Sequence, residues 1–181
     1  MWFIDEKIKI LGGSNLSLKF QNLQEGGMEI SSLLSKDAIK INLESKTKKD
    51  VIKELVELIF KTNKIKDKKK LFQALIEREE LGSTGIGQGI AIPHGKSDTV
   101  LELQAAFGLS KEGISFEALD GEPVNIFFLL VAPEGAAGAH LKALARISSL
   151  LKDKYFRKSL LGVKSSDEVI KIIQDEEKLK Y

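Results

Sequence analysis

Apolar residues recur along the chain with two periods. A period of two predicts strands over residues 39–43, 103–109 and 124–131, and the third is apolar almost throughout, as in a strand that is buried on both faces. A helical spacing predicts four helices, whose buried positions are Val51, Ile52, Leu55, Leu58 and Ile59; Leu71, Phe72, Leu75 and Ile76; Leu141, Leu144, Ile147, Leu150 and Leu151; and Val169, Ile172 and Ile173. Strands that alternate with helices predict an α/β sandwich with a mixed sheet.

Several predicted helix ends carry local signals. Thr47 with Asp50, and Ser165 with Glu168, have the spacing of capping boxes at helix N-termini. Gly82 follows the second helix and suits a left-handed C-terminal cap. His140 is expected to open the third helix, where the positive end of the helix dipole favours an anion.

The first residues differ from the rest of the chain. Residues 1–27 form an N-terminal extension in which WFIDEKIKIL and LSLKFQNL alternate around a Gly-Gly-Ser-Asn turn, and this pattern predicts a β-hairpin. Residues 28–181 are expected to make up the main domain. A chain of 181 residues is the right size for one such core.

Composition narrows the possible functions. The chain is 43% apolar and 30% charged, as in globular proteins, and its longest strongly apolar run, residues 126–132, is far below the roughly 18 residues needed to cross a membrane. The N-terminus lacks the features of a secretory signal, so the cytoplasm is the expected location. The net charge of +2 is too small to indicate nucleic-acid binding, and the basic run over residues 61–70 is interpreted as a solvated connection between helices.

Residue usage also limits the chemistry. The absence of cysteine excludes disulfides, thiolate nucleophiles and thiolate metal sites, and only two histidines are available for imidazole chemistry. The motifs contain no carboxylate cluster of the kind that binds Mg²⁺. The sequence therefore predicts neither a metal nor a cofactor.

A glycine-dense loop over residues 82–89 invites comparison with nucleotide-binding motifs. Both the Walker and the dinucleotide fingerprints require a glycine at position 90, where this chain has Ile90. Two interpretations stay open: the glycines turn the chain tightly, or their backbone N–H groups form a concave wall that suits an anion.

Three side chains are candidates for chemistry: His94, Arg78 and His140. His94 lies at the end of a short strand or in the turn after it, between Pro93 and Gly95, and a neutral imidazole is a competent nucleophile near neutral pH. Arg78 immediately precedes the loop and has the fork geometry for bidentate contact with phosphoryl oxygens. The structural alternatives are a capping or surface role for His140 and a solvated helix end for Arg78.

The residues of this region resemble a known active-site signature. Residues 78–96, REELGSTGIGQGIAIPHGK, look like the signature of phosphotransferase-system IIA domains of the mannitol/fructose class. The resemblance continues through DGEPV at residues 120–124 and HLKALA at residues 140–145, and it extends from about Met28 to the C-terminus. It implies an α/β fold with a mixed central sheet flanked by helices on both faces.

The resemblance also implies roles. His94 corresponds to the phosphorylated histidine, His140 to a second active-site imidazole, and Arg78 to a cationic neighbour, while Ser83, Thr84 and Gly95 belong to the phosphoryl-binding environment. The implied donor is a phosphohistidine carrier protein, HPr or its nitrogen-type homologue. The usual acceptor in the family is a cysteine on a IIB domain, which has to be a separate chain here.

The form of the loop favours one branch of the family. GSTGIG at residues 82–87 is most similar to the nitrogen-regulatory IIA proteins, whose members modulate partner proteins, although Gln88 stands where that pattern has asparagine. The predicted function is therefore a phosphoryl carrier with a regulatory output. The alternative is a fructose- or mannitol-type transport component that donates to a separate IIB cysteine.

Overall fold

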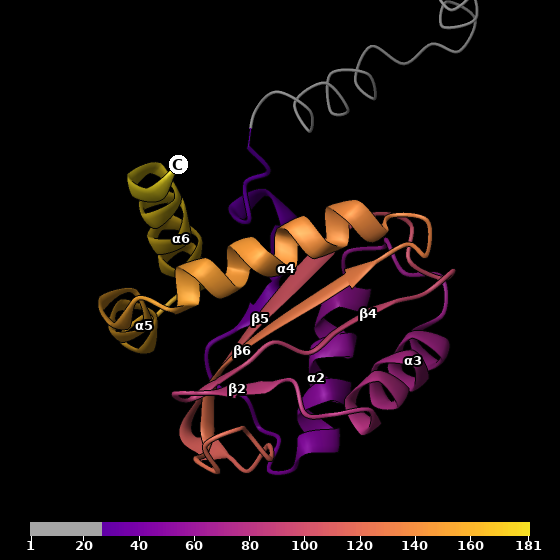
Figure 1. The fold of residues 1–181 in the computed structure, drawn as a ribbon, viewed down its shortest axis with the longest axis horizontal. Helices are drawn as coiled ribbons and strands as arrows, with labels where there is room; N and C mark the ends of the chain where they lie inside the picture. Colours follow the sequence, from indigo (N-terminus) through magenta and orange to yellow (C-terminus); the bar gives the residue numbers. More distant parts are fainter. Residues whose placement is uncertain (1–26) are drawn as a thin grey trace, which may run out of the picture.

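A computed structural model describes residues 27–181 of the protein (Figure 1). The hairpin expected in residues 1–27 therefore lies, apart from Gly27, outside the described residues. No helix within residues 27–181 combines the length and the apolar character that crossing a bilayer requires.

A mixed sheet of six strands lies at the centre of this part of the chain (Figure 1). Its strands are β1 (Leu34–Lys40), β2 (Gly85–Gly87), β3 (Ile90–Ala91), β4 (His94–Lys96), β5 (Gln104–Ile114) and β6 (Val124–Ala132). The order is β1-β5-β6-β3-β2, and β4 also pairs with β6. Strand β1 is parallel to β5, β5 is antiparallel to β6, and β3 and β4 both run parallel to β6.

Helices cover both faces of the sheet, as expected. The helical elements are the short 3-10 turn η2 (Ser31–Leu33), α2 (Lys48–Phe60), α3 (Lys68–Glu80), α4 (Ala137–Leu151), α5 (Lys154–Leu161) and α6 (Ser166–Lys180). Helices α2 and α3 pack on one face, and α4, α5 and α6 pack on the other (Figure 1). The α/β fold with a mixed central sheet is confirmed.

Strand β6 carries the core on both of its sides. Ile126, Phe128 and Leu130 pack towards α4, α5 and α6. Their neighbours in β6 point the other way, towards α2 and α3, and include Phe127 and Leu129. Burial of a side chain of this size contributes about 1.5–3 kcal/mol relative to exposure, so a strand that is buried on both faces holds the two layers together.

The predicted caps form where local sequence specifies them. The Thr47 hydroxyl accepts a hydrogen bond from the N–H of Asp50 at the start of α2, and Ser165 accepts one from Glu168 at the start of α6. Gly82 follows α3 with φ +150°, a backbone region open to glycine, although this is not the left-handed helical value that the sequence suggested.

The bounds of two strands and the presence of one helix differ from the sequence-based expectation. The first strand is Leu34–Lys40 and not residues 39–43, because β1 is covered on both faces and its adjacent residues Ala38 and Ile39 are both buried, which hides a period of two. Strand β5 continues beyond residue 109 to pair Ile114 with Val124. Helix α5 was missed, because a helix of eight residues buries only Phe156 and Leu160.

The start of α4 was also placed wrongly. The helix begins at Ala137, and the N–H of His140 donates to the carbonyl of Ala136 inside the first turn. The small residues before His140 leave room for this extra turn. His140 therefore does not open the helix, and its backbone N–H group is not free for an anion.

Candidate active site

The glycine-dense loop folds into a hairpin that leads to His94. Strands β2 and β3 are joined by a tight turn at Gln88 and Gly89, whose φ values of 57° and 75° are both left-handed. Asparagine adopts this conformation more readily than glutamine, which gives a physical reason for the asparagine of the family pattern at position 88. The N–H of Gln88 donates to Asp120 at 2.7 Å, and this bond ties the turn to the loop before β6.

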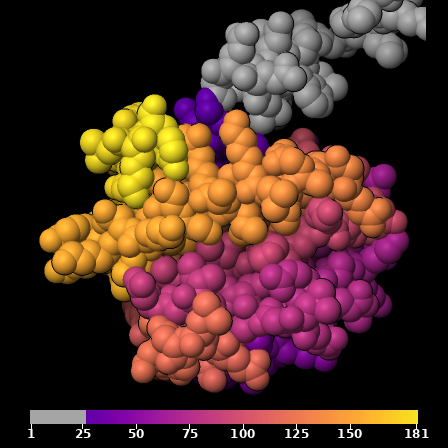
Figure 2. Space-filling model, viewed as in Figure 1, coloured from indigo at the N-terminus to yellow at the C-terminus, as the bar shows by residue number. Residues whose placement is uncertain are grey.

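His94 is the first residue of β4, beside the central strand. Its register partner in β6 is Leu130, whose N–H donates to the carbonyl of Pro93 at 2.9 Å. In the space-filling view, the orange surface of α4 adjoins the magenta surface around residues 80–100 (Figure 2). The fold thus brings the segment of His94 and the first turns of α4 to one place.

The ring of His94 is held in a defined orientation. Its Nδ1 lies 2.8 Å from the carbonyl oxygen of Ile92. A carbonyl can only accept, so in the neutral ring Nδ1 carries the hydrogen and Nε2 keeps its lone pair. The ring is half-buried, which leaves Nε2 as the nitrogen available for nucleophilic attack.

The surroundings keep this ring neutral near pH 7. Burial lowers the pKa of His94 below its usual value of 6.5, and the nearby positive charge of Arg78 lowers this pKa further. The hydrogen bond to Ile92 and the carboxylate of Glu79 act in the opposite direction. The net lowering means that the nucleophilic form predominates at neutral pH.

This lowered pKa predicts how phosphoryl acceptance depends on pH. Only the neutral ring has a free Nε2 lone pair, so acceptance should persist below pH 6.5. The pH at which acceptance is half-maximal should lie below the usual histidine pKa of about 6.5. The pH profile of single-turnover acceptance, together with the NMR titration of the His94 ring, measures this midpoint. A midpoint at or above 6.5 would contradict the role assigned to burial.

His140 lies next to His94 but is more deeply buried. The two ring centroids are 5.8 Å apart, with the ring planes inclined at 45°. His140 is only 6% exposed, and its Nε2 is buried without a hydrogen-bond partner among residues 27–181. Burial, the charge that His94 carries once it is protonated at low pH, and the charge of Lys96 lower the pKa of His140 to about 4, so this imidazole is also neutral at pH 7.

Two cationic side chains flank the histidines. Arg78 lies in the last turn of α3, and its Nη1 donates to the carbonyl of Gly82 at 3.0 Å, which folds the side chain back over the start of the loop. Lys96 is exposed on β4 and lowers the pKa of His140 through its charge. The sequence did not single out Lys96, although its position two residues after His94 on the same strand places it on the same side of the sheet.

The loop itself offers fewer free donors than the sequence suggested. The N–H of Thr84 donates to Glu79, that of Gly85 to the Ser83 hydroxyl, and that of Gln88 to Asp120. The expectation of a wall of free N–H groups is therefore wrong for these three residues, because protein acceptors already satisfy them.

The other members of the expected phosphoryl-binding environment also have structural contacts. The hydroxyl of Ser83 donates to the carbonyl of Phe116, and that of Thr84 donates to Glu79. A Cβ on Gly95 would lie 3.1 Å from a methyl group of Leu75, so glycine allows β4 to pack closely on α3. A direct role of these residues in holding a phosphoryl group stays a prediction.

Glu79 organises the loop, and the sequence analysis missed it. Its buried carboxylate accepts from the N–H of Thr84 at 3.0 and 3.1 Å and from the Thr84 hydroxyl at 2.6 Å. Lys48 at the start of α2 lies 2.8 Å from the same carboxylate. A signal was present, because Glu79 continues the buried face of Leu71 and Leu75 at a spacing of four.

Removing this carboxylate should destabilise the protein. Glu79→Ala leaves the buried N–H and hydroxyl of Thr84 without their acceptor and removes one of the two carboxylates that Lys48 contacts, the other being Glu117. We expect a loss of about 3 kcal/mol in the free energy of unfolding. Glu80→Ala is the matched control, because Glu80 is the exposed neighbour, and its change should stay within about 0.5 kcal/mol. Urea denaturation of both variants measures the difference, and equal losses would show that the buried network adds nothing.

In the described part of the chain, no three His, Asp or Glu side chains gather into a group that can hold a metal ion. The arrangement consists of two neutral imidazoles and two nearby cations. Fixed donors and cations of this kind can stabilise the negative charge that develops on the oxygens of a phosphoryl group during its transfer.

Comparison with known proteins finds relatives by sequence and a solved structure with a similar fold. Over 151 residues the chain is 46% identical to the fructose-specific EIIABC component of the Bacillus subtilis phosphotransferase system. The aligned region makes up 83% of this chain and 24% of that protein. Over 146 residues it is 37% identical to a nitrogen regulatory protein of Bradyrhizobium diazoefficiens, and the aligned region makes up 81% of this chain and 95% of that protein. The crystal structure of nitrogen regulatory protein IIA-Ntr from Neisseria meningitidis has a TM-score of 0.75 and 37% identity, covering 80% of this chain and 98% of that one.

These comparisons confirm the resemblance that the sequence suggested. The family described as "Phosphoenolpyruvate-dependent sugar phosphotransferase system, EIIA 2" matches residues 32–176. This range includes every candidate site residue as well as all six strands. The chain therefore belongs to the EIIA 2 family of the phosphoenolpyruvate-dependent sugar phosphotransferase system.

Proposed function

We propose that this chain accepts a phosphoryl group on Nε2 of His94 from a phosphohistidine carrier protein and passes it to a further protein. The observation that carries the proposal is the hydrogen bond from Nδ1 of His94 to Ile92, which leaves Nε2 as the nucleophilic nitrogen beside a buried second imidazole. In this proposal residues 28–181 make up the IIA domain, and the protein is located in the cytoplasm.

The transfer step needs only groups that the chain and the donor contain. The lone pair of Nε2 attacks phosphorus, the new P–N bond forms as the P–N bond of the donor breaks, and the bonding pair returns to the donor nitrogen. The His94 ring gains positive charge as its pair is shared. The carbonyl of Ile92 then stabilises this charge through the Nδ1–H bond.

The surrounding side chains act on the phosphoryl oxygens. In its neutral form His140 has one N–H, and Nε2 has no partner among the described residues, so a phosphoryl oxygen on His94 supplies the missing acceptor. Arg78 and Lys96 provide positive charge for the same oxygens. His140 therefore supports the phosphoryl group and is not itself phosphorylated.

Two outputs are supported by different relatives. A regulatory output is favoured by the nitrogen regulatory protein, because the matched region makes up 95% of that protein, so a chain of this kind works there without transport domains. Sugar transport with a separate IIB cysteine as acceptor is favoured by the 46% identity to the fructose-specific component. We put the regulatory output first, and the transport output is the alternative.

Partner binding distinguishes the two outputs. Phosphorylation adds about 1.5–2 negative charges, so a partner that docks over residues 82–89 should bind one form of His94 at least tenfold more tightly than the other. The test captures partners from cell extract with His94→Ala and with the charge mimic His94→Asp, and then titrates each partner against phosphorylated and free protein. If every partner binds both forms equally and the phosphoryl group passes to a IIB cysteine, the transport output replaces the regulatory one.

A further inference from the structure

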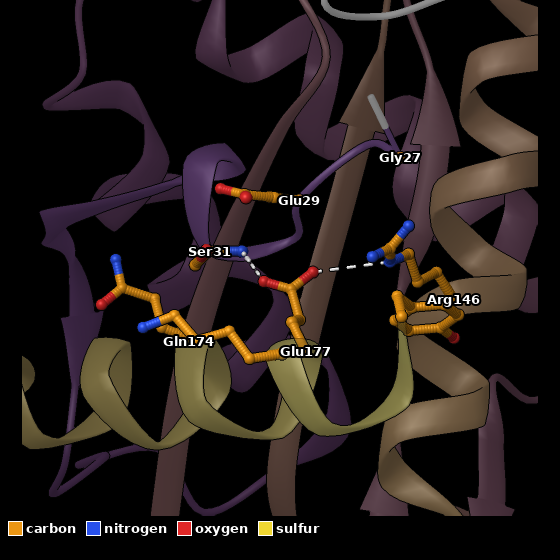
Figure 3. A pocket seen from close by; sticks show the side chains of 8 residues that line it. Gly27, Glu29, Ser31, Arg146, Gln174 and Glu177 are labelled. Atoms are coloured by element: carbon orange, nitrogen blue, oxygen red, sulfur yellow. Dashed lines mark hydrogen bonds and ion pairs between the residues drawn. The ribbon is translucent and has the colours of Figure 1, made fainter. Parts of the chain in front are cut away.

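A second polar cavity lies away from the two histidines. Its volume is about 520 Å³, and it lies where the chain enters the domain at Gly27, between α4 and the C-terminal end of α6 (Figure 3). Its walls include Ser31, Arg146, Glu177 and Tyr181 but neither His94, His140 nor Arg78. The volume falls within the range of roughly 300–1,000 Å³ that is usual for small-molecule sites.

Glu177 forms one wall of the cavity, and both oxygens of its carboxylate accept hydrogen bonds from the backbone. One oxygen accepts from the N–H of Ile30 at 2.6 Å, and the other accepts from the N–H of Ser31 at 3.1 Å. Both bonds attach α6 to the first described residues of the domain. The Glu177 side chain is 5% exposed, and it also forms an ion pair with the guanidinium of Arg146.

That guanidinium, on Arg146, is buried with unmet hydrogen-bonding capacity. Its side chain is 10% exposed, its Nε is 3.5 Å from Glu177, and this Nε has no hydrogen-bond partner among residues 27–181. The ring of Tyr181 covers one face of the guanidinium at 3.6 Å. Stacking and an ion pair therefore hold the charge in a fixed plane, and the guanidinium donates no hydrogen bond to another side chain or backbone group within residues 27–181.

The terminal nitrogens of Arg146 are turned towards the wall of the cavity that Gly27 forms. Figure 3 shows them directed towards Gly27, and a Cβ placed on Gly27 would lie only 2.8 Å from Nη1. The exposed side chain of Glu29 points its carboxylate away from this guanidinium (Figure 3). Lys178 is a second cation in the lining.

We propose that this cavity binds a small oxyanion, a carboxylate or a phosphate, with Arg146 as its anchor. A planar guanidinium fits two oxygens of such an anion side by side, and buried donors without acceptors cost free energy that an anion would recover. Stacking on Tyr181 fixes the orientation before the ligand arrives, so little side-chain entropy is lost on binding. This site is separate from the phosphoryl site and does not depend on the function proposed for His94.

The arginine side chains provide a direct readout. The sequence contains three arginines, Arg78, Arg146 and Arg157. The variants Arg78→Lys and Arg157→Lys each remove one Nε–Hε NMR signal and so assign it. The remaining signal belongs to Arg146. The full chain is titrated with inorganic phosphate and, separately, with succinate. We expect the Arg146 signal to shift and to saturate in the millimolar range, and the tighter of the two probes identifies the oxyanion class.

Matched variants locate the binding by calorimetry. Arg146→Gln should weaken binding at least tenfold, whereas Lys171→Gln, an equal charge change at an exposed position of α6 outside the cavity, should leave it unchanged. Should Arg146→Gln fail to fold, Gly27→Ala tests the same point, because its methyl group crowds Nη1 and should also weaken binding. The proposal is overturned if only the Arg78 signal moves, if the Arg146 signal does not saturate, or if Lys171→Gln weakens binding as much as the cavity variants.

Discussion

His94→Ala is expected to abolish phosphoryl acceptance completely. The variant removes the nitrogen that we propose forms the P–N bond, and the only other histidine, His140, is too deeply buried to replace it. The chain has no cysteine that could serve as a substitute nucleophile. Incubation with a phosphorylated carrier protein followed by mass mapping should place an acid-labile adduct on His94 in the wild type and none in the variant.

The structure also predicts that this variant folds normally. The His94 side chain makes a single hydrogen bond, to the carbonyl of Ile92 in its own segment, and is half-buried, so its removal leaves no buried donor unpaired. Unchanged thermal unfolding therefore provides the control for the loss of activity. Label that persists in His94→Ala, or a stable phosphate on His140, would overturn the assignment.

His140→Ala is expected to slow onward transfer by about 10²-fold while leaving acceptance at His94 measurable. The variant keeps the proposed nucleophile and its orientation but removes the imidazole 5.8 Å away that, in our proposal, supports the phosphoryl oxygens. Rapid-quench measurement of the loss of phosphate from phosphorylated protein to an acceptor gives the rate. His140→Gln retains an N–H donor and should recover part of it.

A titration distinguishes this role from a purely structural one. The pKa of His140 is about 4 in the free protein, and an anion on His94 stabilises the imidazolium form, so phosphorylation should raise this pKa. NMR titration of the ring in both forms measures the change. Unchanged transfer rates in His140→Ala, with a pKa that does not respond to phosphorylation, would reduce His140 to a residue that only packs α4 against the sheet.

Elements that depend on neighbouring residues were predicted from the sequence. Helices α2 and α6 begin where Thr47 and Ser165 cap them, because the hydroxyl and the N–H that it binds are three residues apart. Strand β6 was recognised from its unbroken apolar run, since burial on both faces leaves no polar alternation. Residues 78–96 were likewise sufficient to identify the family, because its signature is contiguous.

Elements that depend on distant contacts were misplaced or missed in the prediction. Strand β1 has no period of two, and its boundaries are set by pairing with β5 and by cover on both faces. Helix α5 has too few apolar positions to show a period, and it forms because Phe156 and Leu160 pack into the core that α4 and α6 complete. In both cases the stabilising contacts come from residues far away in the sequence.

The amino-acid sequence by itself therefore determined the fold class, the capped helices and the candidate residues Arg78, His94 and His140. Only the tertiary structure decided that His140 lies 5.8 Å from His94, that Nδ1 of His94 is bound to Ile92 and that Glu79 holds the loop. The physical reason is the range of the interactions. Capping and periodicity act over about four residues and are visible in one segment, whereas hydrogen-bond partners and pKa values depend on side chains that the folded chain brings together from separate elements.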